Sequence, residues 1–270
     1  MKTRITFPGR LLSLSLGMAM LCLLSACSVF GLGATPQGNA SQTPTQVLQS
    51  AATAMQQLKS AHIAMNVGTT TNGGTTADQQ NGTLSVQANG DQLFPNESSL
   101  HLSVGAMMGN NPTTFSEIVT GNKLYVQNNQ GQWHVIDEGK LTGATFSTIQ
   151  VSNYNNLLML AQNANVTDHG QEALNGQTTR HLTVTFNGDA LKTLLSATGQ
   201  LGSLSMQQQQ NLNQALSQIK LNSSALDLWI DTTSSYVSRL ELKFSISSTN
   251  AGATNENASV DATIDYSKYN

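Results

Sequence analysis

The chain has 270 residues, and only 10% of them are charged, which gives a net charge of −3 at neutral pH. An average soluble protein has about 25% charged residues, so this composition excludes a basic nucleic-acid-binding protein and argues against an enzyme that uses many titratable groups. The two cysteines are too few for a disulfide framework or a multi-cysteine zinc site.

The first predicted element is a secretory signal. Basic residues open the chain, and an uncharged apolar run follows over residues 11–24. This run is shorter than the about 20 residues of a transmembrane helix. It ends in Leu24-Ser25-Ala26-Cys27, which resembles the lipobox of bacterial lipoprotein signals. The resemblance implies that residues 1–26 are removed and that the Cys27 thiol is lipidated. The alternative is a signal peptide cleaved at a nearby alanine without lipidation.

Lipidation of Cys27 would anchor the mature chain to a membrane, because two acyl chains are enough for stable anchoring. Residues 27–43 are rich in small and polar residues and are expected to form a flexible tether. The signal contains three of the 12 basic residues. The mature chain therefore has nine basic and 15 acidic residues, and its net charge becomes −6. Attraction to anionic head groups is therefore not the expected mode of binding. We expect an extracytoplasmic lipoprotein anchored to the cell membrane.

The folded part is predicted to begin with a helix. Thr43 can cap it, Pro44 suits its first position, and Gln46 completes a capping box. Apolar residues then recur at helical spacing up to an expected end near Ser60: Val47, Leu48, Ala51, Met55 and Leu58.

Alternating apolar and polar residues predict strands in the next part of the chain. Gly-containing turns separate them, including Asn81-Gly82, Asn89-Gly90 and Gly121-Asn122. The predicted strands are found near residues 63–67, 84–87, 100–104, 115–120, 123–127 and 132–137. Such regular short strands with tight turns favour an antiparallel meander.

The second half of the chain repeats this pattern with helical segments between the strands. Helices are predicted at 152–163 and within an insertion from Asp189 to Lys220, and strands at 166–174, 178–186, 226–230, 237–247 and 259–266. We expect a single α+β domain over residues 44–270 with about eleven strands. An antiparallel sheet of this size must curl or close.

Short motifs in this order resemble the LppX/LprG (LprAFG) type of lipoprotein in the LolA/LolB-like superfamily. They are Leu58-Lys59-Ser60-Ala61-His62, Gly121-Asn122-Lys123-Leu124-Tyr125-Val126 with Gly131-Gln132-Trp133, Gly176-Gln177-Thr178-Thr179-Arg180-His181-Leu182, Leu228-Trp229-Ile230-Asp231 and Ile264-Asp265-Tyr266-Ser267-Lys268-Tyr269-Asn270. The resemblance implies a large curved antiparallel sheet, a half-barrel, wrapped around helices. It also implies an apolar cavity for the acyl chains of lipids, lipoglycans or lipoproteins. The Gln-rich insertion and the low charge depart from this pattern.

The apolar alternation supplies the candidate ligand-binding residues, which could line such a cavity or form an ordinary core: Met65, Val67, Leu84, Val86, Leu102, Val104, Met107, Leu124 and Val126. Burial of an acyl chain contributes about 0.8 kcal/mol per CH₂. A palmitate-length chain of about 16 carbons would therefore gain on the order of 10 kcal/mol before ordering costs.

Patterns typical of catalysis or metal binding are missing from the sequence. The five histidines form no HxH or HExxH spacing and are interpreted as surface or strand-end residues, and there is no G-x-S-x-G motif. We therefore expect no enzyme activity, no catalytic residue, no metal and no cofactor. The leading hypothesis is a carrier or chaperone of acyl chains. A non-catalytic envelope sensor or protein-interaction module on the same fold is the alternative, with an envelope protein as its partner.

Overall fold

The computed structural model describes residues 42–72, 82–94, 97–105, 112–120, 123–128, 130–137, 164–188, 190, 219–248 and 256–270. These contain helix α2 (Pro44–Gln56) and eleven strands. The strands are β1 (Ser60–Asn72), β2 (Gly82–Leu93), β3 (Glu97–Gly105), β4 (Thr113–Thr120), β5 (Lys123–Gln127), β6 (Trp133–Asp137), β7 (Asn165–Leu174), β8 (Gln177–Thr185), β9 (Ile219–Asp231), β10 (Val237–Ser248) and β11 (Glu256–Ser267).

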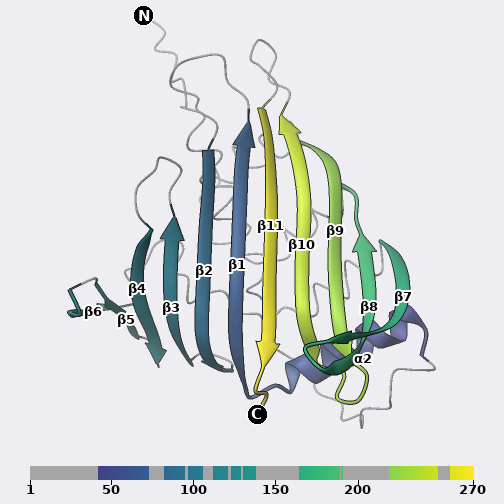
Figure 1. Ribbon diagram of the computed structural model, residues 1–270, viewed down its shortest axis with the longest axis horizontal. Coiled ribbons are helices and arrows are strands. Elements are labelled where there is room, and N and C mark those ends of the chain that lie inside the picture. Colours follow the sequence, from purple (N-terminus) through teal and green to yellow (C-terminus); the bar gives the residue numbers. More distant parts are fainter. Residues whose placement is uncertain are drawn as a thin grey trace, which may run out of the picture.

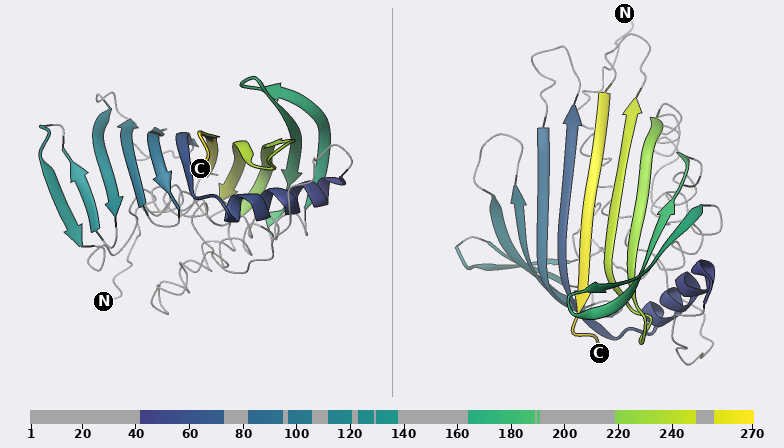
Figure 2. Two further views of the ribbon diagram at one scale, coloured as in Figure 1. Left: turned by 90° about the horizontal axis from the view of Figure 1, so that it is seen from below. Right: turned by 45° about the vertical axis from the view of Figure 1, so that its right-hand side comes forward.

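The strands form a single open sheet in the order β6-β5-β4-β3-β2-β1-β11-β10-β9-β8-β7 (Figure 1). Neighbouring strands are antiparallel throughout, as in two meanders joined at the centre. The sheet is curved, and α2 crosses one of its faces near β7–β10 (Figure 2). The expected fold class, α+β with a large curved antiparallel sheet, is confirmed. Of the helices around which the sheet was expected to wrap, the described residues contain α2.

The beginning of α2 follows its predicted capping box. The backbone N–H of Gln46 donates to Thr43 Oγ1 at 3.4 Å, and the N–H of Thr43 donates to Gln46 Oε1 at 2.9 Å. These bonds satisfy two groups that a helix start would otherwise leave unpaired. The apolar stripe of α2 is buried in the same cluster as the apolar side chains of the strands: Val47, Leu48, Ala51, Ala52 and Met55.

The two meanders are joined by pairing between the first and last strands. β1 and β11 pair from His62 opposite Ser267 to Asn72 opposite Asn257. The last residue, Asn270, extends this contact, because its N–H donates to the carbonyl oxygen of Ser60 at 3.0 Å. The centre of the sheet therefore depends on a contact between the two ends of the domain.

The strand register places the core on the face that α2 covers. Opposite residues of an antiparallel pair lie on the same face, so a row can be followed from strand to strand. One such row runs Phe115, Leu102, Ala88, Met65, Ile264, Leu240, Leu228 and Leu182, and all of these except Phe115 are buried. This row crosses eight strands and forms the centre of the apolar face.

One predicted turn is wrong. Asn89-Gly90 lies within β2, which continues to Leu93. A Cβ atom at Gly90 would overlap the backbone carbonyl oxygen of Ser99 on β3. Glycine is therefore required there by the close approach of two strands and not by a change of chain direction. The predicted helix at 152–163 and most of the predicted insertion from Asp189 to Lys220 lie outside the described residues.

Candidate functional site

The predicted cavity-lining residues lie on a single face of the sheet. Met65, Val67, Val86, Leu102 and Leu124 are buried there. The strand register adds Leu84, Val104 and Val126 to the same face, and these three are half-buried. Met107 lies outside the described residues. The alternation in the sequence thus assigned eight residues to one face, and whether they line a cavity stays a prediction.

These residues occupy the part of the sheet that α2 does not cross. They belong to β1–β5, whereas α2 lies toward β7–β10 (Figure 2). Two contacts fix α2 at that side. Arg180 on β8 donates from Nη1 to the carbonyl oxygen of Gln42 at 2.8 Å, and the N–H of Val237 on β10 lies 3.4 Å from the sulfur of Met55. The helix is therefore held at the β7–β10 side of the apolar face and does not cross the part formed by β1–β5.

A buried carboxyl group interrupts this face. Glu117 on β4 lies directly opposite Leu100 on β3 and Val126 on β5, and its exposed fraction is 2%. Its Oε1 atom has no hydrogen-bond partner among the described residues. Burial raises the pKa of Glu117 from 4.5 to about 7, because a charged carboxylate is disfavoured away from water.

Two further polar residues lie on the same face, Ser98 diagonally from Glu117 on β3 and Gln92 one strand further away on β2. Ser98 on β3 is opposite Val119, two positions along β4 from Glu117, and on its other side it is opposite the buried Gln92 of β2. The Oγ atom of Ser98 also has no hydrogen-bond partner in the described part of the chain. We call Gln92, Ser98 and Glu117 the inner polar cluster.

Sequence reasoning missed this cluster, although a signal was present. Glu117 stands between Phe115 and Val119 at the same period-two spacing, so the predicted strand already placed it on the apolar face. A charged residue within an apolar stripe is an informative exception and could have been singled out.

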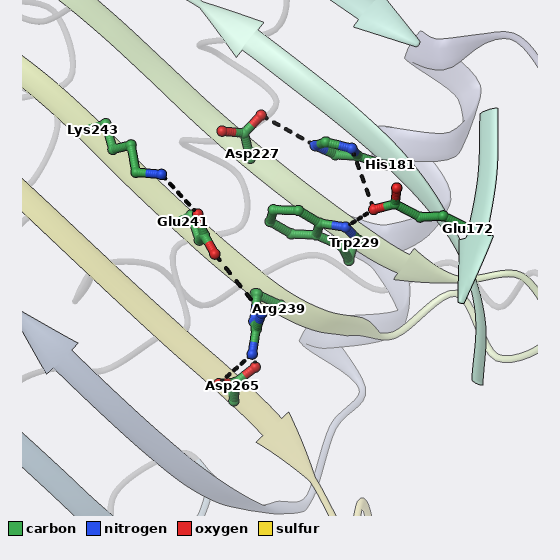
Figure 3. A network of polar contacts seen from close by, with 8 residues as sticks. All are labelled: Glu172, His181, Asp227, Trp229, Arg239, Glu241, Lys243 and Asp265. Atoms are coloured by element: carbon green, nitrogen blue, oxygen red, sulfur yellow. Dashed lines mark hydrogen bonds and ion pairs between the residues drawn. The ribbon is translucent and has the colours of Figure 1, made fainter. Parts of the chain in front are cut away.

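The opposite, outer face carries a network of ion pairs on β10 and β11 (Figure 3). Arg239 binds Asp265 through two bonds, from Nε to Oδ1 at 2.7 Å and from Nη2 to Oδ2 at 3.0 Å. This pair raises the pKa of Arg239. Glu241 lies 3.9 Å from Arg239 and accepts a bond from Lys243 at 3.1 Å. All four charges are paired, which is typical of a structural network.

Next to this network, three aromatic rings are stacked across β7, β8 and β9. The ring of His181 lies 4.5 Å from that of His169 and 4.3 Å from that of Trp229. The two ring nitrogens of His181 face carboxylates, with Nε2 3.2 Å from Asp227 and Nδ1 3.4 Å from Glu172 (Figure 3). The interpretation of the histidines as surface or strand-end residues is wrong for His181, which lies half-buried within β8.

The outer face also has an open depression of about 310 Å³ between β3, β2, β1 and β11. Its lining is mainly polar: Asn66, Gln87, Asn89, His101, Ser103, Thr263 and Asp265, with Ala64, Met65 and Ala88. In the described ranges, no group of three or more His, Cys, Asp or Glu residues is placed to hold a metal ion. Within the same ranges, no helix has the length and apolar character needed to span a membrane.

The model of a "Family of unknown function (DUF6612)" matches residues 43–270. No curated protein matches the chain. Among solved structures, LprF from Mycobacterium bovis is similar with a TM-score of 0.45 and 13% identity, over 87% of this chain and 95% of that chain. The Mycobacterium tuberculosis lipoprotein LppX is similar with a TM-score of 0.43 and 17% identity, over 84% of this chain and 97% of that chain.

A putative outer membrane lipoprotein-sorting protein domain from Vibrio parahaemolyticus is similar with a TM-score of 0.23 and 7% identity, over 84% of this chain and 91% of that chain. TM-scores below 0.5 do not establish a shared fold, so the architecture rests on the strand order and register of this chain. The family match covers nearly the whole described region. The chain belongs to the family of unknown function DUF6612.

Proposed function

We propose that the protein is a membrane-anchored extracytoplasmic lipoprotein that binds acyl chains on its apolar face and carries or shields them. The observation that carries this proposal is the placement of the predicted lining residues. Eight of them share the apolar face, and they lie in β1–β5, away from α2. An apolar face on an open curved sheet suits a flexible apolar ligand better than a small polar one.

The chemistry of this face favours binding through apolar burial. Each CH₂ group that leaves water contributes about 0.8 kcal/mol, and no charged partner is needed. Met65 adds an adaptable side chain that can follow ligands of different shape. Such binding requires no catalytic group, and we propose a non-catalytic role with lipids or acylated molecules as partners.

The anchor is the second part of the proposal. We propose that residues 1–26 act as the signal peptide, that Cys27 is lipidated, and that residues 27–43 link it to the folded domain, 44–270. The lipobox resemblance at Leu24-Ser25-Ala26-Cys27 supports this assignment. A tether of this length would keep the binding face near the membrane without fixing its orientation.

Native mass spectrometry of the full chain, purified from membranes in detergent, tests the proposal. Acyl groups on Cys27 remain covalently attached, whereas a lipid bound to the apolar face is released by collisional activation. The proposal expects a released lipid together with a permanent mass increase on Cys27. A protein that carries no releasable lipid, even after incubation with a membrane lipid extract, would contradict the binding function.

The alternative, an envelope sensor or interaction module, is favoured by one observation. Trp133 and Val135 on the edge strand β6 have exposed fractions of 44% and 56%. Exposed apolar side chains on an unpaired edge can bind another chain by strand addition. A double variant with Trp133→Ser and Val135→Thr would lose a protein partner and retain its lipid if both functions existed.

A further inference from the structure

The inner polar cluster lies where an apolar ligand would be expected to bind. Glu117 is directly opposite Val126, and Leu102 follows Leu100 on the same face of β3. Val126 and Leu102 are both predicted ligand-binding residues. A ligand on this part of the face would therefore pass a carboxyl group and a hydroxyl group.

One oxygen atom of each group lacks a hydrogen-bond partner within the described residues. Oε1 of Glu117 and Oγ of Ser98 are buried and make no hydrogen bond there. Nearly all buried polar groups in folded proteins are hydrogen-bonded, and an unmade bond destabilises the fold. Two such atoms on adjacent strands indicate a site that is completed by a bound molecule.

We propose that Glu117 and Ser98 bind the uncharged ester group of an acyl lipid whose chains lie on the adjacent apolar residues. This inference rests on the proposed function and names the chemical class of its ligand. Ser98 Oγ–H donates to one ester oxygen. The protonated carboxyl group of Glu117 donates to another.

The surroundings of Glu117 argue for an uncharged ligand group. On this face its described neighbours are Leu100 and Val126 on the adjacent strands and Phe115 and Val119 on β4, and none of these is titratable. The next titratable side chain along the row is His134 on β6, one strand beyond Val126. Among the described residues, no cation adjoins the carboxyl group to hold an anionic phosphate, and the carboxylate itself would repel one.

The protonation state of Glu117 agrees with this chemistry. Its pKa of about 7 leaves a large fraction of the carboxyl groups neutral at physiological pH, so that they can donate a hydrogen bond. An ester carbonyl accepts hydrogen bonds and donates none. A carboxylate, formed at higher pH, would face the carbonyl oxygen with a like partial charge, so preference for the ester should fall as the pH rises.

The test is a competition between two lipids on the full chain. Equimolar 1,2-dipalmitoylglycerol and its ether analogue 1,2-dihexadecylglycerol are added in detergent, and native mass spectrometry counts the two adducts. The lipids have equal chain lengths and the same free hydroxyl group and differ only in the ester carbonyls. We expect the wild type to favour the ester by about fivefold at pH 6, the effect of one or two buried hydrogen bonds, and to lose this preference by pH 8.5.

Variants separate the cluster from the rest of the face. Glu117→Leu should bind the two lipids about equally, and Glu117→Gln, whose amide still donates, should favour the ester at both pH values. Ser98→Ala should lower the preference about twofold to threefold, which keeps the test decisive should Glu117→Leu not fold. Ser99→Ala, on the outer face of the same strand, is the matched control and should behave as wild type.

Two results would contradict different claims. Equal binding of both lipids by the wild type, or an unchanged ester preference in Glu117→Leu and Ser98→Ala, would overturn the ester site and leave the acyl-binding function intact. Binding of neither lipid by the wild type would contradict the proposed function and the ester site together.

Discussion

Glu117 on β4 and Val126 on β5 lie directly opposite each other on the apolar face of the sheet. The valine was predicted to contact a ligand, whereas the carboxyl group was not singled out in the sequence. The pair shows that this face combines apolar surface with a buried titratable group. Stability and ligand binding should therefore both depend on pH.

The first prediction concerns stability and pH. The pKa of Glu117 is raised from 4.5 to about 7 by burial, so the folded state binds this proton more tightly than the unfolded chain does. The stability linked to this group is therefore highest below pH 4.5 and is lost as the pH rises to about 7. A pKa shift of this size corresponds to a change of about 3 kcal/mol in the free energy of unfolding.

Glu117→Gln removes this titration. We expect urea unfolding to show that the free energy of unfolding of the variant, relative to that of the wild type, is about 3 kcal/mol higher at pH 8 than at pH 4.5. Comparison with the wild type cancels the contributions of the other carboxyl groups. A constant difference between the two proteins at both pH values would show that Glu117 is not buried in the folded protein.

The second prediction concerns Gly90. Replacing it with alanine would drive a Cβ atom into the carbonyl oxygen of Ser99 and separate β2 from β3. We expect Gly90→Ala to lower the free energy of unfolding by about 2 kcal/mol or more. Gly68→Ala in β1 is the control, because its Cβ would have its nearest contact at 3.9 Å from the carbonyl oxygen of Asp261. Equal effects in urea unfolding would contradict the close approach of β2 and β3.

The third prediction concerns the attachment of α2. Arg180 pairs with Asp168 and also binds the carbonyl oxygen of Gln42, just before the helix. Its hydrogen bond to Asp168 is the main cause of the lowered pKa of that carboxyl group. The stability from this pair is thus present above pH 3.8, the ordinary pKa of the group, and is lost as the pH falls through the lowered value.

We expect Arg180→Met to cost about 2 kcal/mol at pH 7, because it leaves a partly buried carboxylate without its partner. The difference from wild type should shrink in acid. Lys243→Met is the control: this side chain is 54% exposed and pairs with Glu241, so its loss should cost less than about 1 kcal/mol. Similar losses for the two variants at pH 7 would contradict a role for Arg180 in holding α2.

Local patterns in the sequence were enough for much of this structure. Thr43 and Gln46 defined the helix start, and the period-two alternation identified the strands and the shared face of Met65 and Leu102. Asn89-Gly90 was predicted as a turn because an Asn-Gly pair looks the same in the sequence whether it forms a turn or lies within a strand. The difference lies in Ser99 on the next strand, which local reasoning does not see.

The features that local patterns did not predict depend on contacts between residues far apart in the sequence. Pairing of β1 with β11 joins residues nearly 200 positions apart in the chain, such as Met65 and Ile264, and no local pattern encodes it. The inner polar cluster is similar, because Ser98 and Glu117 become neighbours only through the register of β3 and β4. The stack of His169, His181 and Trp229 likewise needs three strands in register.

The most direct test of acyl-chain binding compares two neighbouring positions on β3. Val104 lies half-buried on the apolar face, and Ser103 points to the outer face. Native mass spectrometry of the full chain should show releasable lipid on the wild type and on Ser103→Trp, and at least about fivefold less on Val104→Trp, where the indole occupies the ligand's place. Both variants should remain folded by circular dichroism. Undiminished lipid on folded Val104→Trp, or no releasable lipid on the wild type, would contradict the account.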